Sequence, residues 1–114
     1  LVHCDLINGN ALVDDTGLTG IFDWGCALYG DHLYDLAWFE FWAPWFPQLN
    51  IEALRFALEA RWQAVDYTPE DQALRLMACY LHIGLDHLAY NAHLEDWPAL
   101  EATADRMQVL VAFD

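Results

Sequence analysis

The sequence predicts an α+β fold that is mainly helical, with one small β-hairpin followed by about four helices. Three observations lead to this fold class. The chain has 114 residues, of which 57% are hydrophobic, so it contains enough apolar side chains for one buried core. Short apolar runs separated by turn residues precede residue 25, and after it apolar residues recur with a helical period. We find no repeats or linkers, so residues 1–114 are expected to form a single domain.

The predicted hairpin comprises two short apolar runs, residues 11–13 and 18–22. Between them lies Asp14-Asp15-Thr16-Gly17, whose Asp and Gly residues favour a tight turn between antiparallel strands. A two-stranded hairpin is barely stable by itself, so we expect this one to pack on the helices.

The first two predicted helices follow residue 30. Asp31 is placed to cap the first helix, which Pro44 and Pro47 end. The apolar side of this helix comprises Leu33, Leu36, Ala37 and Phe41. The second helix has an apolar stripe with a period of 3.6 residues, formed by Ile51, Leu54, Leu58, Trp62 and Val65.

The last two helices complete the predicted fold. Residues 68–71, Thr-Pro-Glu-Asp, have the hydroxyl cap, first-turn proline and acidic residues that favour a helix start. About five turns with one apolar face follow, and that face comprises Leu74, Met77, Leu81, Leu85 and Leu88. A final helix over residues 98–111 has on one side Leu100, Ala104, Met107 and Val111.

The charge of the chain restricts its partners. Eighteen Asp and Glu residues stand against four Arg, with a net charge of −14. Such a charge repels phosphate backbones and argues against nucleic acid, whereas it favours divalent metal ions or a polycationic small molecule. The most apolar run, residues 36–46, contains Glu40 and Pro44 and is too short to cross a bilayer.

Cysteines and aromatic residues add two expectations. Cys4, Cys26 and Cys79 are odd in number and lack C-x-x-C spacing, which predicts reduced, partly buried thiols in a cytoplasmic protein. The six Trp, five Tyr and six Phe residues exceed what a core of this size needs. Some of them are therefore expected to face a partner, a ligand or a missing part of the same polypeptide.

Three polar residues have a spacing that suggests chemistry. Asp5 and Asn10 share one loop, and Asp23 follows the second predicted strand. A loop next to a strand pair can bring these side chains together. Asn10 and Asp23 offer the hard oxygen ligands that Mg²⁺ prefers, and Asp5 beside them is free to accept a hydroxyl proton.

The pattern H-x-D-x-x-x-x-N, followed by an Asp after a hairpin, is the arrangement of a kinase catalytic loop. Asn8-Gly9 also suits a type I′ turn, so a plain hairpin over residues 1–13 with Asp5 exposed by accident is the alternative. The joint spacing of Asp5, Asn10 and Asp23 favours the kinase interpretation.

Several segments resemble the aminoglycoside phosphotransferase and choline kinase superfamily. Residues 3–13, His-Cys-Asp-Leu-Ile-Asn-Gly-Asn-Ala-Leu-Val, resemble its H-G-D-x-x-x-x-N motif. Residues 20–25, Gly-Ile-Phe-Asp-Trp-Gly, resemble its I-D-W-G motif, and residues 30–37 resemble its G-D-P-x-x-D-L-A helix. Residues 41–45 and 83–88 most resemble hygromycin B phosphotransferases. The resemblance covers most of the chain.

This resemblance implies the C-terminal lobe of a protein-kinase-like fold that transfers the γ-phosphate of ATP to a small-molecule hydroxyl. By position, Asp5 is the implied catalytic base, and Asn10 and Asp23 are the implied Mg²⁺ ligands. The implied supporting residues of the loop are His3, which matches the structural histidine, and two acids, Asp31 and Asp35.

The chain departs from the family pattern at Cys4, where Gly is usual, and at His32, where Pro is usual. The resemblance also implies that the N-terminal nucleotide lobe is absent, as does a start without Met at Leu1-Val2-His3, which resembles a strand already under way. With no Lys, and no Arg before Arg55, the chain cannot balance the charge of a triphosphate with its own side chains.

Other residues have competing interpretations. Cys79, His82, Asp86 and His93 lie near one helical face, a spacing that allows a zinc site, although surface histidines beside a leucine stripe are commoner. Most of the aromatic run over residues 38–46 is expected in the core, with Trp42 and Trp45 the expected pocket residues. Four acids are open either to substrate ammonium groups or to solvent: Glu40, Asp86, Glu95 and Asp96.

Three functions are compatible with the sequence. The first is an ATP-dependent phosphotransferase acting on an aminoglycoside-like cationic alcohol, consistent with the acidic composition. The second keeps the fold and replaces this substrate with choline, a sugar, homoserine or a macrolide. The third is a non-catalytic fragment or binding module, for which we expect no ATP turnover and self-association through an exposed aromatic surface. The substrate-binding residues stay unassigned.

Overall fold

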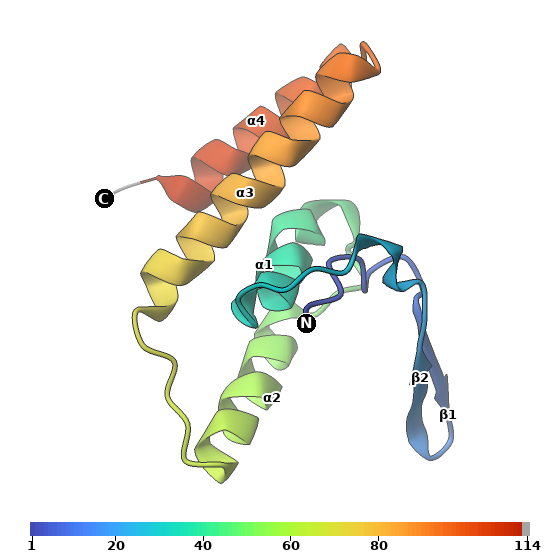
Figure 1. The fold of residues 1–114 in the computed structure, drawn as a ribbon, viewed down its shortest axis with the longest axis vertical. Coiled ribbons are helices and arrows are strands. Elements are labelled where there is room, and N and C mark those ends of the chain that lie inside the picture. Colours follow the sequence, from blue (N-terminus) through green and yellow to red (C-terminus); the bar gives the residue numbers. More distant parts are fainter. Residues whose placement is uncertain (113–114) are drawn as a thin grey trace.

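A computed structural model describes residues 1–112 (Figure 1). These residues form an antiparallel sheet of two strands and four α-helices, which confirms the predicted mainly helical α+β fold. The strands are β1 (Ala11–Asp14) and β2 (Gly17–Ile21). The helices are α1 (Leu33–Trp42), α2 (Ile51–Ala64), α3 (Gln72–His93) and α4 (Trp97–Val111), with 3₁₀ turns at Trp24–Cys26 and Ala43–Trp45.

The hairpin has the predicted strands and turn. Ala11 pairs with Ile21 and Asp14 with Gly17, with one irregularity after Leu12. Gly17 has φ 121°, a conformation that favours glycine, and the Asp14 carboxylate accepts the Thr16 N–H at 2.7 Å. The backbone pairing continues past the strands, since the Phe22 N–H donates to the Asn10 carbonyl at 3.0 Å.

The expectation that the hairpin packs on the helices is wrong. It projects away from all four helices (Figure 1), and every strand residue except Gly20 is exposed. Only its base is attached to the rest of the described chain, where Val2 and Leu28 exchange two backbone hydrogen bonds of 2.9 and 3.1 Å. That pairing also rules out a plain hairpin over residues 1–13. The apolar side chains of Leu12 and Leu18 are consequently left uncovered within residues 1–112.

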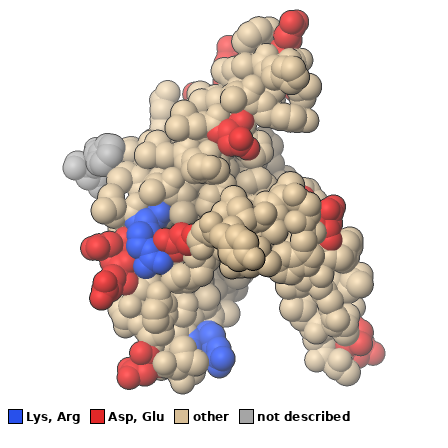
Figure 2. Space-filling view, in the orientation of Figure 1, with Lys and Arg blue, Asp and Glu red and all other residues tan. Residues whose placement is uncertain are grey.

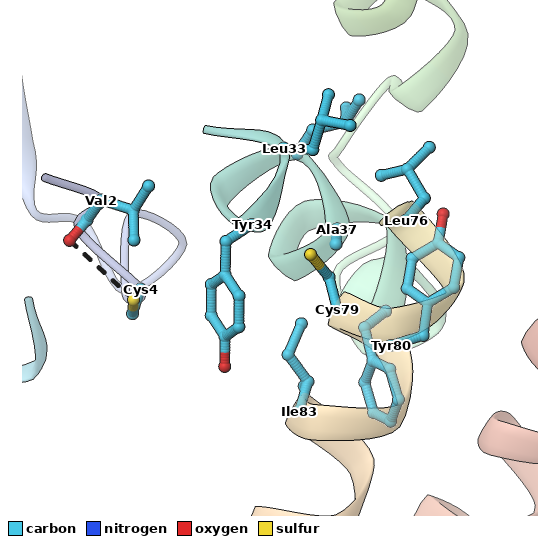
Figure 3. Close-up of a cluster of buried hydrophobic side chains, with 11 residues drawn as sticks. Val2, Cys4, Leu33, Tyr34, Ala37, Leu76, Cys79, Tyr80 and Ile83 are labelled. Carbon is cyan, nitrogen blue, oxygen red and sulfur yellow. Dashed lines mark hydrogen bonds between the residues drawn. The ribbon is translucent and has the colours of Figure 1, made fainter. Parts of the chain in front are cut away.

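The core lies between α1 and α3 (Figure 3). The predicted apolar stripe of α1 is confirmed, because Leu33, Leu36, Ala37 and Phe41 are all buried. The second predicted stripe also packs on this core through Leu54, Leu58 and Trp62, although Val65 stays half exposed. Pro44 ends α1 as predicted, because the chain turns into a 3₁₀ segment there.

The predicted apolar face of α3 is wrong for three of its leucines: Leu74, Leu81 and Leu85 are exposed. The face turned toward α1 comprises Leu76, Cys79, Tyr80 and Ile83 (Figure 3). Both sets have helical spacing, since this helix is apolar on more than one side. Periodicity alone therefore identified the helix without identifying its buried face.

Helix α4 lies alongside α3 (Figure 1), as its predicted apolar side requires. Gly84 allows the close approach, because a β-carbon added there would stand 2.3 Å from Met107 Cγ. A buried hydrogen bond of 3.2 Å joins Asn91 Nδ2 to Thr103 Oγ1 across the two helices.

The helix starts differ in how well they were predicted. The Asp31 carboxylate accepts the Leu33 N–H at 2.9 Å, so Asp31 makes the predicted capping contact, although the N-cap position of α1 is occupied by the next residue, His32. Asn50 and Asp96 cap α2 and α4 in the same way. The predicted start at residues 68–71 is wrong, because Asp71 is left-handed at φ 47° and α3 begins only at Gln72.

No helix among the described residues combines the length and the hydropathy needed to cross a membrane. In Figure 2 the hairpin, at the lower right, presents acidic side chains and no basic ones on the face shown.

Candidate active site

The loop between His3 and Asn10 brings two of the predicted site residues into direct contact. The Asn10 Nδ2 group donates to the Asp5 backbone carbonyl at 2.7 Å and to its Oδ2 at 3.3 Å. From the other side, Asn8 Nδ2 donates to Asp5 Oδ1 at 2.6 Å. A carboxylate has about four lone-pair sites, so Asp5 keeps acceptor capacity for a further proton donor.

Asn10 is oriented by these bonds. Its side chain is buried, with 6% of the residue exposed, and its amide nitrogen points at Asp5. Since the nitrogen is engaged in that way, the amide oxygen Oδ1 is the atom left for another ligand. No hydrogen bond to Oδ1 occurs within residues 1–112. An oriented oxygen without a partner suits a hard cation.

Asp23 lies next to Asn10 through the hairpin register. Phe22 pairs with Asn10, and Asp23 follows it in a left-handed conformation with φ 58°. Its carboxylate is exposed and caps nothing in the following 3₁₀ turn. The described residues thus present two oxygen-bearing side chains at the base of the hairpin.

The His3 side chain connects the loop that contains Asp5 with the segment that contains Asp23. Its Nδ1 accepts the Asp5 N–H at 3.2 Å, which assigns the ring proton to Nε2, and Nε2 donates to the Phe22 carbonyl at 2.8 Å. The ring is 1% exposed and packs against Trp24 with centroids 4.7 Å apart. One neutral imidazole therefore positions the backbone on both sides, beside Asp5 and before Asp23.

Asp35 binds the loop from α1. Its carboxylate accepts the His3 N–H at 3.0 and 3.1 Å and the Cys4 N–H at 2.8 Å. Cys4 itself is left-handed with φ 65°, a conformation that glycine adopts more readily, which explains why glycine is usual at this motif position.

We expect Asp35→Ala to lower the free energy of unfolding by about 2 kcal/mol, because two backbone N–H groups lose a charged acceptor in a partly buried place. Urea unfolding followed by circular dichroism measures the loss. Asp105→Ala, an exposed acid on α4, is the matched control and should change stability by less than about 0.5 kcal/mol. Equal losses in the two variants would contradict the bracing contact.

Asp31 makes a different kind of contact. Arg75 on α3 forms two hydrogen bonds of 2.7 Å with its carboxylate, which join the start of α1 to α3. The hydrogen bonds from Arg75 lower the pKa of Asp31 to about 2.

This ion pair predicts a pH-dependent stability. The folded pKa of Asp31 lies below its unfolded value, so the stabilisation is complete above about pH 4 and is lost as the pH falls toward 2. Arg75→Met should therefore lower the urea midpoint at pH 7, and the two proteins should converge between pH 4 and pH 2. Arg61→Met, on the exposed side of α2, is the control. A midpoint difference that stays constant with pH would argue against the pair.

An aromatic cavity of about 190 Å³ adjoins the loop. It is lined by Ile7, Asn8, Trp38, Trp42, Phe46 and His87. Trp42 Nε1 is buried and has no acceptor within the described residues. Trp45 lies behind it, with its ring centroid 5.4 Å from that of Trp42, and does not line the cavity.

The remaining candidates separate clearly. Within residues 1–112, no three His, Cys, Asp or Glu side chains lie close enough together to hold a metal ion. The residues of the alternative zinc site on α3 therefore do not form such a group. Asp96 is engaged as the cap of α4, and Glu95 is exposed. Asp86 lines a second cavity beside the loop, together with Cys4 and Tyr34.

Sequence reasoning missed the network around Glu40. This acid is buried, forms an ion pair with Arg55 and accepts a hydrogen bond from Tyr80. Arg106 donates to the backbone carbonyls of Glu40 and Phe41 at 2.5 and 2.9 Å. The signal was present, because an acid inside the most apolar run of the chain needs a buried partner.

The chain was compared with known proteins. Over 88 residues it is 36% identical to hygromycin-B 4-O-kinase from Escherichia coli, a segment that makes up 77% of this chain and 24% of that protein. The chain thus spans about a quarter of the length of this relative. No solved structure matches significantly. The profile of the phosphotransferase enzyme family, APH, matches residues 1–70, more than half of the chain, and the chain therefore belongs to this family.

Proposed function

We propose that this chain contains the phosphoryl-transfer loop of an ATP-dependent kinase for small-molecule alcohols. In this proposal, residues 1–114 form one domain, the C-terminal lobe of a protein-kinase-like fold. The observation that carries it is the contact between Asn10 and Asp5. The Asn10 amide nitrogen binds the Asp5 carbonyl at 2.7 Å, which leaves the Asn10 amide oxygen without a partner among the described residues, beside a carboxylate that keeps acceptor capacity. Membership in a phosphotransferase family supports the same chemistry.

Asp5 is the proposed catalytic base. Its carboxylate orients the acceptor hydroxyl and accepts the proton as the hydroxyl oxygen bonds to the γ-phosphorus, while ADP departs with the electrons of the broken P–O bond. Asn8 and Asn10 fix the carboxylate from two sides, so it is oriented before substrate arrives.

Asn10 and Asp23 are the proposed Mg²⁺ ligands. Both provide hard oxygens, and neither oxygen set is used by other groups within residues 1–112. When bound, the ion offsets negative charge on the phosphate oxygens. His3, Asp35 and Asp31 are proposed as supports that set the shape of the loop and of the helix start, since their contacts reach backbone and α3.

By itself the chain is proposed to be inactive. Three of its four arginines are engaged in the fold: Arg55 with Glu40, Arg75 with Asp31, and Arg106 with backbone carbonyls. A triphosphate therefore needs cations from another part of the protein, which corresponds to the nucleotide lobe expected from the sequence. The uncovered hairpin fits the same view, because its apolar side chains lack a covering element within the described residues.

The proposed substrate is an aminoglycoside-like cationic alcohol. The similarity to hygromycin-B 4-O-kinase supports this class, as does a net charge of −14. The aromatic cavity next to Asn8 provides apolar ring faces, which suit the faces of a sugar ring. Choline, a sugar, homoserine or a macrolide is the alternative substrate.

The decisive assay measures ADP release with Mg-ATP by the longest product that the gene encodes, beside the 114-residue chain. The substrates are hygromycin, other aminoglycosides, choline, homoserine and macrolides. We expect turnover with a cationic antibiotic by the longer product and none by the short chain. Turnover with another alcohol supports the alternative substrate, and no ATP-dependent phosphorylation of any alcohol contradicts the proposal.

A further inference from the structure

Two cysteines stand opposite each other at the base of the hairpin. Val2 and Leu28 exchange both of their backbone hydrogen bonds, which makes this an antiparallel pair. Counting two residues inward along each segment leads to Cys4 and Cys26. In a regular antiparallel pair, residues at these positions would face each other with Cα atoms about 4.5–5.5 Å apart. Neither cysteine is in a strand, but the Val2–Leu28 pair holds the two segments side by side. A disulfide spans Cα separations of about 4.4–6.8 Å.

Both side chains also face one space. Cys4 and Cys26 line the same cavity of about 380 Å³, on the loop side of α3. Cys4 is 4% exposed and donates its S–H to the Val2 carbonyl, whereas Cys26 is exposed (Figure 3 shows Cys4 beside Val2). After the Val2–Leu28 pair no further backbone bond joins the segments, since Cys4 is left-handed and Cys26 ends a 3₁₀ turn.

The electrostatics agree with this proximity. Burial raises the pKa of the Cys4 thiol to about 11, and the negative charges of Asp35 and of a Cys26 thiolate raise it further. Cys79, in contrast, is buried in the core between α1 and α3.

We propose that Cys4 and Cys26 form a reversible disulfide with a low-molecular-weight disulfide, such as glutathione disulfide, as the oxidant. The exposed Cys26 thiolate attacks one sulfur of the oxidant and releases one glutathione thiolate. The Cys4 thiolate then attacks the Cys26 sulfur of the mixed disulfide and releases the second. Two protein thiols are oxidised, one small disulfide is reduced to two thiols, and the two protons go to the departing glutathione thiolates.

The bridge closes residues 4–26 into a loop that contains Asp5, Asn10 and Asp23. The base of the hairpin, attached through a few hydrogen bonds in the dithiol form, becomes covalently attached. The high pKa of Cys4 makes the second step the slow one and makes its rate rise with pH. Any effect of the bridge on phosphoryl transfer rests on the proposed function, whereas the bridge itself does not.

The test equilibrates the full chain with reduced and oxidised glutathione at several ratios, blocks free thiols by alkylation and digests it with a protease that cuts before Asp. Cleavage at Asp5 and Asp23 separates peptide 1–4 from peptide 23–30. We expect these two peptides to be joined in oxidising mixtures and separate after reduction. Cys79→Ser should leave the joined peptide unchanged, and Cys26→Ser should abolish it.

A second readout does not depend on variants that fold. In the wild-type chain the bridged form should melt about 10 °C or more above the dithiol form, because it closes a loop of some twenty residues. A joined peptide together with this shift supports the proposal. Two results would overturn it. One is glutathione attached to Cys26 alone at every ratio, with Cys4 alkylated only after unfolding. The other is a bridged form that melts below the dithiol form.

Discussion

Asp5→Asn is expected to slow phosphoryl transfer by about 10²–10⁴-fold while leaving the fold intact. The amide oxygen of the variant still accepts the hydrogen bond that Asn8 donates to Asp5 Oδ1. It cannot take the proton of an acceptor hydroxyl at neutral pH. The change should therefore appear in kcat, with the KM values for ATP and alcohol little altered.

The measurement is ADP release by the longest gene product with the alcohol that it turns over. Asp15→Asn, an exposed acid in the turn of the hairpin, removes the same charge from a place remote from the loop and should keep the full rate. Matching far-ultraviolet circular dichroism for both variants excludes unfolding as the cause. A full rate for Asp5→Asn would remove Asp5 from the role of base and leave the family assignment untouched.

Local signals in the sequence predicted the parts of the structure that depend on neighbours along the chain. The hairpin follows from Asp14 and Gly17 between apolar runs, and the end of α1 follows from Pro44. The cap by Asp31 is likewise a contact over two residues. The start of α3 was missed, because residues 68–71 have the right residue types, but Asp71 adopts a left-handed conformation that no local rule required.

Contacts between distant residues could not be predicted in the same way. The leucine stripe at Leu74, Leu81 and Leu85 satisfies a helical period as well as the buried face does, and only the position of α1 decides between them. The contact of Asp35 with the loop spans 31 residues of sequence. It was implied by family resemblance, whereas composition and spacing contained no sign of it.

The two halves of the proposed site depend on α1 in different ways. Asp35 accepts hydrogen bonds from the backbone of the Asp5 loop. His3, in the same loop, donates to the Phe22 carbonyl and so links the loop to the segment that contains Asp23. Because the hairpin makes no other substantial contact with the described helices, His3 and the Val2–Leu28 pair set where Asp23 lies relative to Asp5. The geometry of the site thus depends on the stability of the core beneath α1.

That dependence makes Glu40 the residue whose loss should affect stability most. Glu40→Ala is expected to lower the free energy of unfolding by about 2–3 kcal/mol, because it removes the acceptor of a buried hydroxyl together with a partly exposed ion pair. Arg55 then loses its ion pair, and the Tyr80 hydroxyl loses its acceptor. Burial and the bond to Glu40 both raise the pKa of Tyr80 above its usual range, so its hydroxyl remains a donor at neutral pH.

A double-mutant cycle separates this network from simple loss of side-chain volume. Tyr80→Phe removes only the hydroxyl, and we expect the Glu40–Tyr80 coupling to be about 1–3 kcal/mol. Glu101→Ala, an exposed acid on α4, should change stability by less than about 0.5 kcal/mol in the same urea titrations. Additive losses in the cycle would mean that the Tyr80 hydroxyl does not contribute to stability through Glu40. A coupled loss means that the hydrogen bond between Glu40 and Tyr80 joins α1 to α3, and α1 in turn binds the loop of Asp5 through Asp35.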